Sequence, residues 1–323
     1  MNFKEVQQII DSDLKRVSET IRSFLDSKIS FIGQVASYLI ESGGKRFRPT
    51  VHILSARACG YEGDRMYTIA STLEFIHTAT LLHDDVVDYA ELRRGQPTAN
   101  VLWGNEATVL VGDFLLARSF YALVGDEDLD ILRCISNATT RMAEGEILQL
   151  LQTNNPEITF EDYLEIIKCK TAVLIAAASE TGAILGKKNR EIRERMHNFG
   201  MNIGIAFQIT DDTLDYIIED KTLGKTRGQD FIDGKVTLPF ILAYEKSDKC
   251  EREILKNLFL KDEKDQNDFE KIYSILESKN AFNLSFEYAN RYVEKAKEDI
   301  SFLDSHYREY LSIIADYILE RKY

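Results

Sequence analysis

The chain has 323 residues, a net charge of −13 and a hydrophobic content of 44%, which is enough for a sizeable core. An acidic chain lacks the basic surface that nucleic acid requires, so its charge argues against a nucleic-acid partner. No apolar run reaches the roughly 18 residues of a membrane span, and the first residues lack the pattern of a signal peptide. We therefore expect a cytoplasmic protein without a transmembrane segment. Its four cysteines have no metal-ligand spacing, so we expect reduced thiols.

Apolar periodicity predicts helices through the first half of the chain. Residues 1–40 carry an amphipathic pattern of one or two helices, and Asp64 stands where the N-cap of a helix over residues 65–89 would lie. Mostly apolar helices are expected over 105–125 and 128–153. Only 4 prolines in the whole chain leave room for such long segments.

The second half continues the same pattern with almost no strand signal. Thr159 and Asp162 form a capping-box pattern before the next helix. Further helices are expected over residues 191–219, from residue 237, in the charge-rich stretch 246–271, and over 283–303 and 305–321. Because no linker interrupts residues 1–323, we expect a single all-α domain, a helical bundle.

Two acidic clusters share one spacing. Residues i and i+4 of a helix lie on one face, so the first and third aspartates of an Asp-Asp-x-x-Asp segment point the same way. Carboxylates this close repel one another, and oxygen-rich clusters suit Mg²⁺, which completes its shell with water and phosphates. We expect the two clusters to face each other across the bundle and to hold a diphosphate through Mg²⁺. They consist of Asp84, Asp85 and Asp88, and of Asp211, Asp212 and Asp215.

A single Asp-x-x-x-Asp pair is usually just a solvated helix face. Here each cluster lies among apolar residues, such as Leu82 and Val86 in the first and Ile209 and Leu214 in the second. Two complete copies in such settings favour a functional site.

Cationic residues near these clusters form a complementary set. Each alone is more often a surface charge, but together they can bind two diphosphates through arginine forks and lysine charges. His77 lies two turns before Asp84, as either a satisfied core histidine or a phosphate donor, and Gln208 shares the face of Asp211. The cationic set is Lys45, Arg48, Arg93, Arg94, Lys170, Lys225 and Lys235.

These motifs together resemble the trans-prenyltransferases, the polyprenyl diphosphate synthases. The resemblance rests on Gly-Gly-Lys-Arg-x-Arg-Pro at 43–49, the two Asp motifs, Arg-Arg-Gly at 93–95, Lys-Thr at 170–171, and the Gly-Lys pairs at 224–225 and 234–235. It covers nearly the whole chain and fades after about residue 245. The stretch 74–88, EFIHTATLLHDDVVD, is most similar to bacterial octaprenyl diphosphate synthases.

The resemblance implies an isoprenoid-synthase bundle around a deep cavity, normally a homodimer. The implied reaction condenses an allylic diphosphate head-to-tail with isopentenyl diphosphate, with Mg²⁺ as cofactor (three ions with diphosphate bound, or Mn²⁺ in its place). Asp84, Asp85, Asp88, Asp211 and Asp215 would hold the metal, with Asp212 in support. Arg93, Lys170, Lys225 and Lys235 would bind the allylic diphosphate, and Lys45, Arg48, His77 and Arg94 would bind isopentenyl diphosphate. Thr171 and Gln208 would lie near the developing carbocation.

Product length depends on the helix upstream of Asp84, where the family limits the product with a bulky side chain. Ala79 and Thr80 are both small, so the path along this helix is open. A helix of 20 residues spans roughly 30 Å, enough for a long isoprenoid. We therefore expect a long product, of about eight isoprene units, from a farnesyl or geranylgeranyl primer.

Three alternatives remain at this stage. A shorter-chain synthase, making farnesyl or geranylgeranyl diphosphate, differs only in its product. A terpene cyclase normally has Asn and Ser in its second metal motif and needs no second cationic site. A non-catalytic helical subunit of a heteromeric synthase would show no Mg²⁺-dependent diphosphate release.

Overall fold

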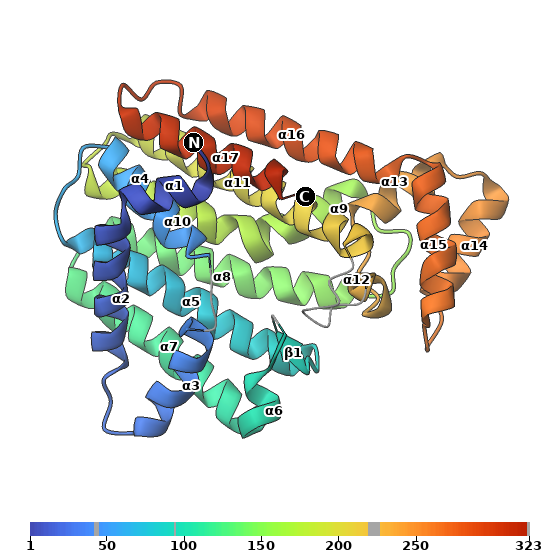
Figure 1. Ribbon diagram of the computed structural model, residues 1–323, viewed down its shortest axis with the longest axis horizontal. Coiled ribbons are helices and arrows are strands. Elements are labelled where there is room, and N and C mark those ends of the chain that lie inside the picture. The colour runs from blue at the N-terminus through green and yellow to red at the C-terminus, as the bar shows by residue number, and fades with distance from the viewer. Residues whose placement is uncertain (42–44, 94, 219–226, 322–323) are drawn as a thin grey trace. The chain divides into compact units, whose positions relative to one another are not determined.

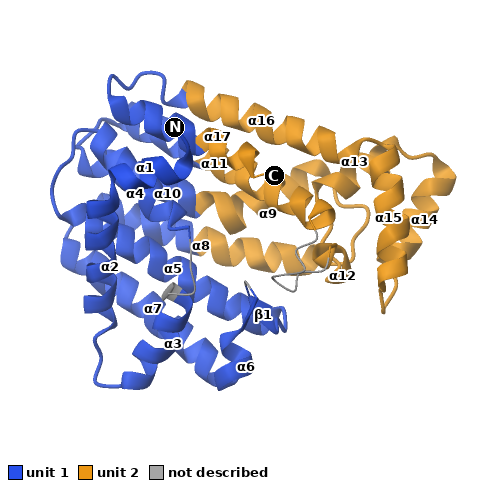
Figure 2. Ribbon diagram, viewed as in Figure 1, with its two compact units in different colours: residues 1–139, 174–200, 299–314 blue, residues 140–173, 201–298, 315–323 orange. Residues whose placement is uncertain are grey.

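The structure, a computed structural model, describes residues 1–41, 45–93, 95–218 and 227–321. Helices dominate throughout, which confirms the predicted all-α class (Figure 1). The chain forms two compact units, each assembled from separate segments of sequence (Figure 2). Unit 1 comprises residues 1–139, 174–200 and 299–314, and unit 2 comprises residues 140–173, 201–298 and 315–323. A single domain over the whole chain stays a prediction.

Unit 1 is built around α5, with α7 as its main packing partner and α2 and α4 beside it (Figure 1). Helix α5 is apolar on most sides, and Ile69, Leu73, Ile76 and Leu82 are fully buried. Its elements are α1 (Phe3–Ile9), α2 (Asp11–Leu25), α3 (Ser30–Glu41), α4 (Phe47–Ala58), α5 (Arg65–Val87), the hairpin β1 (Leu92–Arg93) and β2 (Gln96–Pro97), α6 (Ala99–Trp103), α7 (Asn105–Asp126) and nearly all of α10 (Val173–Leu185).

Unit 2 holds the carboxyl-terminal helices and a short π-helical turn. Its elements are α9 (Phe160–Ile167), the π-helix η1 (Lys168–Ala172), α12 (Gln229–Ile232), α13 (Leu238–Lys246), α14 (Lys249–Phe259), α15 (Gln266–Ser278) and nearly all of α16 (Ala281–Asp299). Three further helices contribute residues to both units, namely α8 (Leu129–Gln152), α11 (Arg190–Ile217) and α17 (His306–Glu320).

An aromatic cluster in unit 2 fixes the segment that follows the second Asp motif. Phe231 of α12 meets Phe259 edge-on at 5.2 Å between ring centroids. Gly228 has a φ of +80°, and a Cβ there would lie 2.1 Å from the ring of Phe269, so only glycine fits. Its amide donates to the carbonyl of Asp215 at 2.9 Å, which ties this segment to the end of α11.

Most predicted helix positions are confirmed to within a few residues, and two local details are informative. Thr159 and Asp162 form the predicted capping box at the start of α9. Asp64 does precede α5, but its side chain makes no capping hydrogen bond and instead accepts from Arg16 at 2.9 Å, so its predicted capping role is wrong. The loop predicted at residues 91–98 contains the small hairpin of β1 and β2.

One helix among the described residues, α7, is long and apolar enough to cross a membrane by length and composition alone. The most apolar window of α7 is 33% buried, and the helix packs along α5. None of the four cysteines, all of which are among the described residues, forms a disulfide.

Candidate active site

The first Asp motif lies in the last turn of α5. Asp85 is fully buried, and its Oδ1 accepts hydrogen bonds from Arg93 Nε at 2.9 Å and Nη2 at 2.7 Å. The other oxygen, Asp85 Oδ2, is buried without a hydrogen-bond partner among the described residues. Asp84 is half-buried and Asp88 is exposed, so the middle aspartate is the one that faces the interior of unit 1.

The second Asp motif lies near the end of α11, in unit 2. Arg321, just beyond α17, pairs with Asp211 at 2.5 Å, and its guanidinium lies 4.4 Å from the ring centroid of Phe207. Asp215 Oδ2 accepts from the amide of Asp230 at 3.1 Å. Asp211 and Asp215 are half-buried, and Asp212 between them is buried.

Two neutral side chains hold Asp212. Tyr163 of α9 donates to Oδ2 at 2.6 Å, and Gln208, one turn earlier on α11, donates to Oδ1 at 2.7 Å. Burial raises the pKa of the Asp212 carboxyl to about 7. The two hydrogen bonds lower that pKa, while repulsion from Asp211 and Asp215 raises it further.

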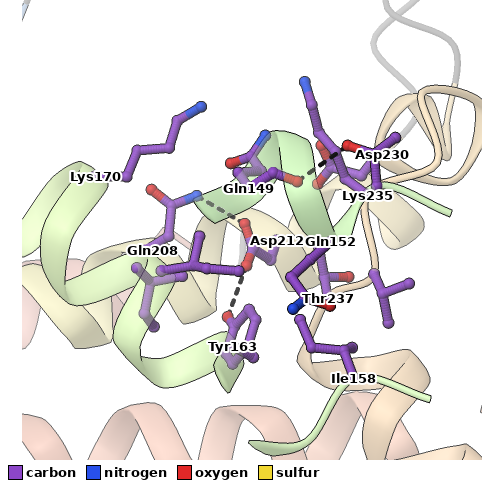
Figure 3. Close-up of a pocket in the computed structure, with 14 residues that line it drawn as sticks. Gln149, Gln152, Ile158, Tyr163, Lys170, Gln208, Asp212, Asp230, Lys235 and Thr237 are labelled. Carbon is purple, nitrogen blue, oxygen red and sulfur yellow. Dashed lines mark hydrogen bonds between the residues drawn. The ribbon is translucent and has the colours of Figure 1, made fainter. Parts of the chain in front are cut away.

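A cavity of about 170 Å³ opens beside Asp212 within unit 2 (Figure 3). Four of the predicted site residues line it, namely Lys170, Gln208, Asp212 and Lys235. Asp230 also lines it, and burial together with repulsion from Asp215 and Asp212 raises the pKa of its carboxyl well above the usual value, although Lys235 opposes this. The cavity therefore combines carboxylates with cationic side chains, as binding of a metal-bound anion requires.

The π-helical turn η1 carries the predicted Lys170 and Thr171. Lys170 pairs with Glu146 of α8 at 2.9 Å, and Thr171 donates to Gln208 Oε1 at 2.6 Å. A Cβ at Gly145 would lie 2.7 Å from the backbone nitrogen of Lys170, so glycine allows α8 to approach η1 closely. Such π-helical turns often occur at functional sites because they redirect side chains.

Three further predicted residues of unit 1 lie just before α4 (Lys45), on α4 (Arg48) and on α5 (His77). Lys45 is exposed, and Arg48 is half-buried with a buried Nε that has no hydrogen-bond partner among the described residues. Burial lowers the pKa of Arg48 to about 10, although the charge of Glu74 on α5 raises it. His77 is half-buried one turn further along α5. An incompletely matched buried guanidinium fits an anionic ligand.

The predicted chain-length residues lie on the same helix. Ala79 is buried, and Thr80 is half-buried with its hydroxyl donating to the carbonyl of His77 at 2.8 Å. Two predicted residues, Arg94 and Lys225, lie outside the described residues. The expectation that the two Asp motifs face each other across a deep cavity stays a prediction.

Sequence reasoning missed several residues that the structure brings to this site. Tyr163, Asp230, Glu146 and Arg321 all contact a predicted site residue. Only Glu146 carried a signal in the sequence, because it lies in the polar stretch Glu144-Gly145-Glu146 of an otherwise apolar helix end.

The acidic residues fit a divalent cation that is bound together with a diphosphate. Carboxylate oxygens are the donors that Mg²⁺ and Ca²⁺ prefer, and the buried Asp85 Oδ2 still lacks a partner among the described residues. Within those residues no three acidic, histidine or cysteine side chains converge on one point. A metal held by one or two carboxylates plus substrate phosphates requires no such convergence.

Comparison with known proteins identifies the family. The family model described as polyprenyl synthetase matches residues 29–276. The chain is 36% identical over 324 residues to the octaprenyl diphosphate synthase of Haemophilus influenzae, covering 100% of this chain and 98% of that protein. The chain therefore belongs to the polyprenyl synthetase family and is a prenyltransferase, which decides against the terpene cyclase alternative.

Solved structures agree with this assignment. A decaprenyl diphosphate synthase from Rhodobacter capsulatus is similar with a TM-score of 0.94 at 38% identity, covering 99% of each chain. A polyprenyl synthase from Caulobacter crescentus, complexed with calcium and isoprenyl diphosphate, is equally similar, with a TM-score of 0.94, 38% identity and coverage of 99% of this chain and 98% of that one. Other relatives are named for geranylgeranyl, heptaprenyl and nonaprenyl products, so membership alone leaves product length open.

Proposed function

We propose that the chain is a long-chain all-trans polyprenyl diphosphate synthase. It condenses isopentenyl diphosphate head-to-tail onto a farnesyl or geranylgeranyl primer, and its product contains about eight isoprene units. The observation that carries the proposal is the cavity of unit 2, where Asp212 of the second Asp motif meets Lys170, Lys235 and Gln208. A cavity with carboxylates on one element and cations on others suits a metal-bound diphosphate.

Mg²⁺ is the metal that we assign to this reaction. Asp84, Asp85, Asp88, Asp211 and Asp215 would hold it together with the diphosphate, with Asp212 in support. When bound, the metal neutralises charge that grows on the diphosphate as its C–O bond breaks. The calcium found with isoprenyl diphosphate in the Caulobacter crescentus protein supports a divalent ion in this role.

The cationic residues divide between two diphosphates. Lys170 and Lys235, with Arg93 and Lys225, would bind the allylic diphosphate and stabilise its departure. Lys45, Arg48, His77 and Arg94 would bind isopentenyl diphosphate. The buried Arg48 Nε, which has no partner among the described residues, supports an anion site on this side of unit 1. An apolar surrounding would then shield the allylic cation from water.

Product length follows from the open path along α5. Ala79 and Thr80 add little volume next to the first Asp motif, and this supports a long product. A homodimer in the cytoplasm completes the proposal. Exposed apolar residues on α7, among them Leu110, Tyr121 and Val124, support a protein partner for this helix.

Incubation of the purified chain with labelled isopentenyl diphosphate, Mg²⁺ and each candidate primer tests the proposal. We expect Mg²⁺-dependent release of pyrophosphate and a product of about eight units on chromatography, with both lost after chelation of the metal. A product of three or four units would instead support the shorter-chain synthase. No release with any primer would support the non-catalytic subunit.

A further inference from the structure

Four side chains in unit 2 form one continuous chain of hydrogen bonds (Figure 3 shows its second and third bonds). Thr171 Oγ1 donates to Gln208 Oε1 at 2.6 Å, and Gln208 Nε2 donates to Asp212 Oδ1 at 2.7 Å. Tyr163 donates its hydroxyl to Asp212 Oδ2 at 2.6 Å. The chain joins α11 to α9 and to the π-helical turn η1, which follows α9 directly in the sequence.

The directions of these bonds are determined by chemistry. When Asp212 is ionised its carboxylate can only accept, so the amide nitrogen of Gln208 then faces it, as the structure has it. The carbonyl oxygen of Gln208 then faces Thr171, whose hydroxyl must donate. Tyr163, Thr171 and Asp212 are 2%, 8% and 5% exposed, so bulk water has little access to replace any one of these bonds.

This arrangement decides what Gln208 can offer to the cavity that it lines. One N–H of its amide is committed to Asp212, which orients the amide so that the carbonyl oxygen, the negative end of its dipole, lies at the opposite end, where it accepts from Thr171 and keeps a second lone pair for a ligand. A fixed acceptor dipole stabilises positive charge, such as the charge of an allylic cation. An inverted amide would instead present N–H groups and would oppose that charge.

We propose that Tyr163 is a positioning residue that fixes the amide of Gln208 through Asp212, so that the carbonyl oxygen of Gln208 is turned toward positive charge in the cavity. This role deepens the proposed function and rests on it. Without the hydroxyl of Tyr163, Asp212 is anchored at one oxygen only and can rotate. Gln208 then loses the contact that selects one orientation of its amide.

The test replaces Tyr163 by phenylalanine, which keeps the ring and removes only the hydroxyl. We expect Tyr163→Phe to lower kcat for the condensation about tenfold, because a charge-assisted hydrogen bond is lost, and to leave both KM values within about twofold. The matched control is Tyr67→Phe. Tyr67 is also buried and donates to an aspartate, Asp13, at 2.7 Å, but it belongs to unit 1 and is not a member of this chain of bonds. Its kcat should equal that of the wild type.

A double-mutant cycle distinguishes a positioning effect of Tyr163 on Gln208 from a general destabilisation of the fold. If Tyr163 acts through Gln208, Tyr163→Phe should have no further effect on kcat in a Gln208→Ala background. An equal loss in both backgrounds would overturn the proposal. Asp212→Asn provides a second route if Tyr163→Phe does not fold, because it removes the acceptor for one of the two donors while keeping the shape. Because Asp212 also supports the metal, the effect of Asp212→Asn should shrink when Gln208 is alanine and leave only the part due to the metal, and an undiminished effect would overturn the proposal.

Binding measurements test the role of Tyr163 without catalytic turnover. Calorimetry with a trialkylammonium analogue of the allylic cation, added with inorganic pyrophosphate and Mg²⁺, should show about tenfold weaker binding of the analogue to Tyr163→Phe. Binding of pyrophosphate alone should not change. Equal affinity for the analogue in wild type and variant would overturn the role of Tyr163. Absence of condensation by the wild type would overturn the proposed function instead.

Discussion

The two Asp motifs have the same spacing but different surroundings. In both, the middle aspartate is buried and the outer two are half-buried or exposed. Asp85 on α5 is held by a cation, Arg93, whereas Asp212 on α11 is held by two neutral donors, Tyr163 and Gln208. The ion pair compensates the charge of the first carboxylate, whereas the second has only neutral donors, and burial raises its pKa to about 7.

Within each Asp-Asp-x-x-Asp motif, the outer aspartates and the middle aspartate therefore have different roles. The outer aspartates share a face one helical turn apart, where a metal-bound ligand can reach them. The middle aspartate is rotated by about 100° and points toward its own unit, where it connects the motif to neighbouring elements. The upstream residues differ as well: Thr80 precedes Asp84 by four positions, and the bulky Phe207 precedes Asp211 by four.

The largest effect should come from the outer aspartates. Asp84→Ala and Asp211→Ala should each lower kcat on the order of a thousandfold, because each removes a negative ligand from the transition-state charge network. Calorimetric titration of Mg²⁺ in the presence of inorganic pyrophosphate should show weaker metal binding in both variants. Asp11→Ala, which removes an exposed carboxylate paired with Lys15, is the control. If Mg²⁺ bound equally well to Asp84→Ala and Asp211→Ala, the outer aspartates would not be the metal ligands that distinguish them from the middle ones.

A smaller effect, on stability, is expected at the middle aspartate of the first motif. Asp85→Asn should lower the free energy of unfolding by about 2 kcal/mol, because it breaks a buried hydrogen-bonded charge pair whose arginine is partly exposed. Denaturant unfolding measures this change. In an Arg93→Gln background, Asp85→Asn should lower the free energy of unfolding by clearly less than it does in the wild type. Equal costs in both backgrounds would show that Arg93 does not hold Asp85.

Product length should respond only upstream of the first motif. Ala79→Tyr places a bulky side chain beside the path along α5 and should shorten the product by several isoprene units, which chromatography of the dephosphorylated product would detect. Because Ala79 is buried, the larger side chain can destabilise the fold. Thr80→Phe, at a half-buried position, is therefore the companion variant. Full-length product from both folded variants would refute the path along α5.

The smallest effect concerns Arg321, which pairs with Asp211 of the second motif. Its charge competes with a metal for the same carboxylate, so Arg321→Gln should lower the Mg²⁺ concentration for half-maximal activity about threefold. Arg308→Gln is the matched control, because the guanidinium of this α17 arginine donates to a backbone carbonyl, that of Ser301, at 3.1 Å. A higher Mg²⁺ requirement would mean that Arg321 holds Asp211 in its binding position.

The sequence alone determined the all-α class, most helix positions, the two Asp motifs and the family. These features follow from local periodicity and from residue types at short spacing, which act within one helix or one loop. The tertiary structure decided which groups surround each aspartate. Tyr163 reaches Asp212 across 49 positions of sequence, and Lys170 reaches Glu146 across 24. Such contacts depend on how helices pack, and periodicity within a helix carries no record of which neighbour its buried face will meet.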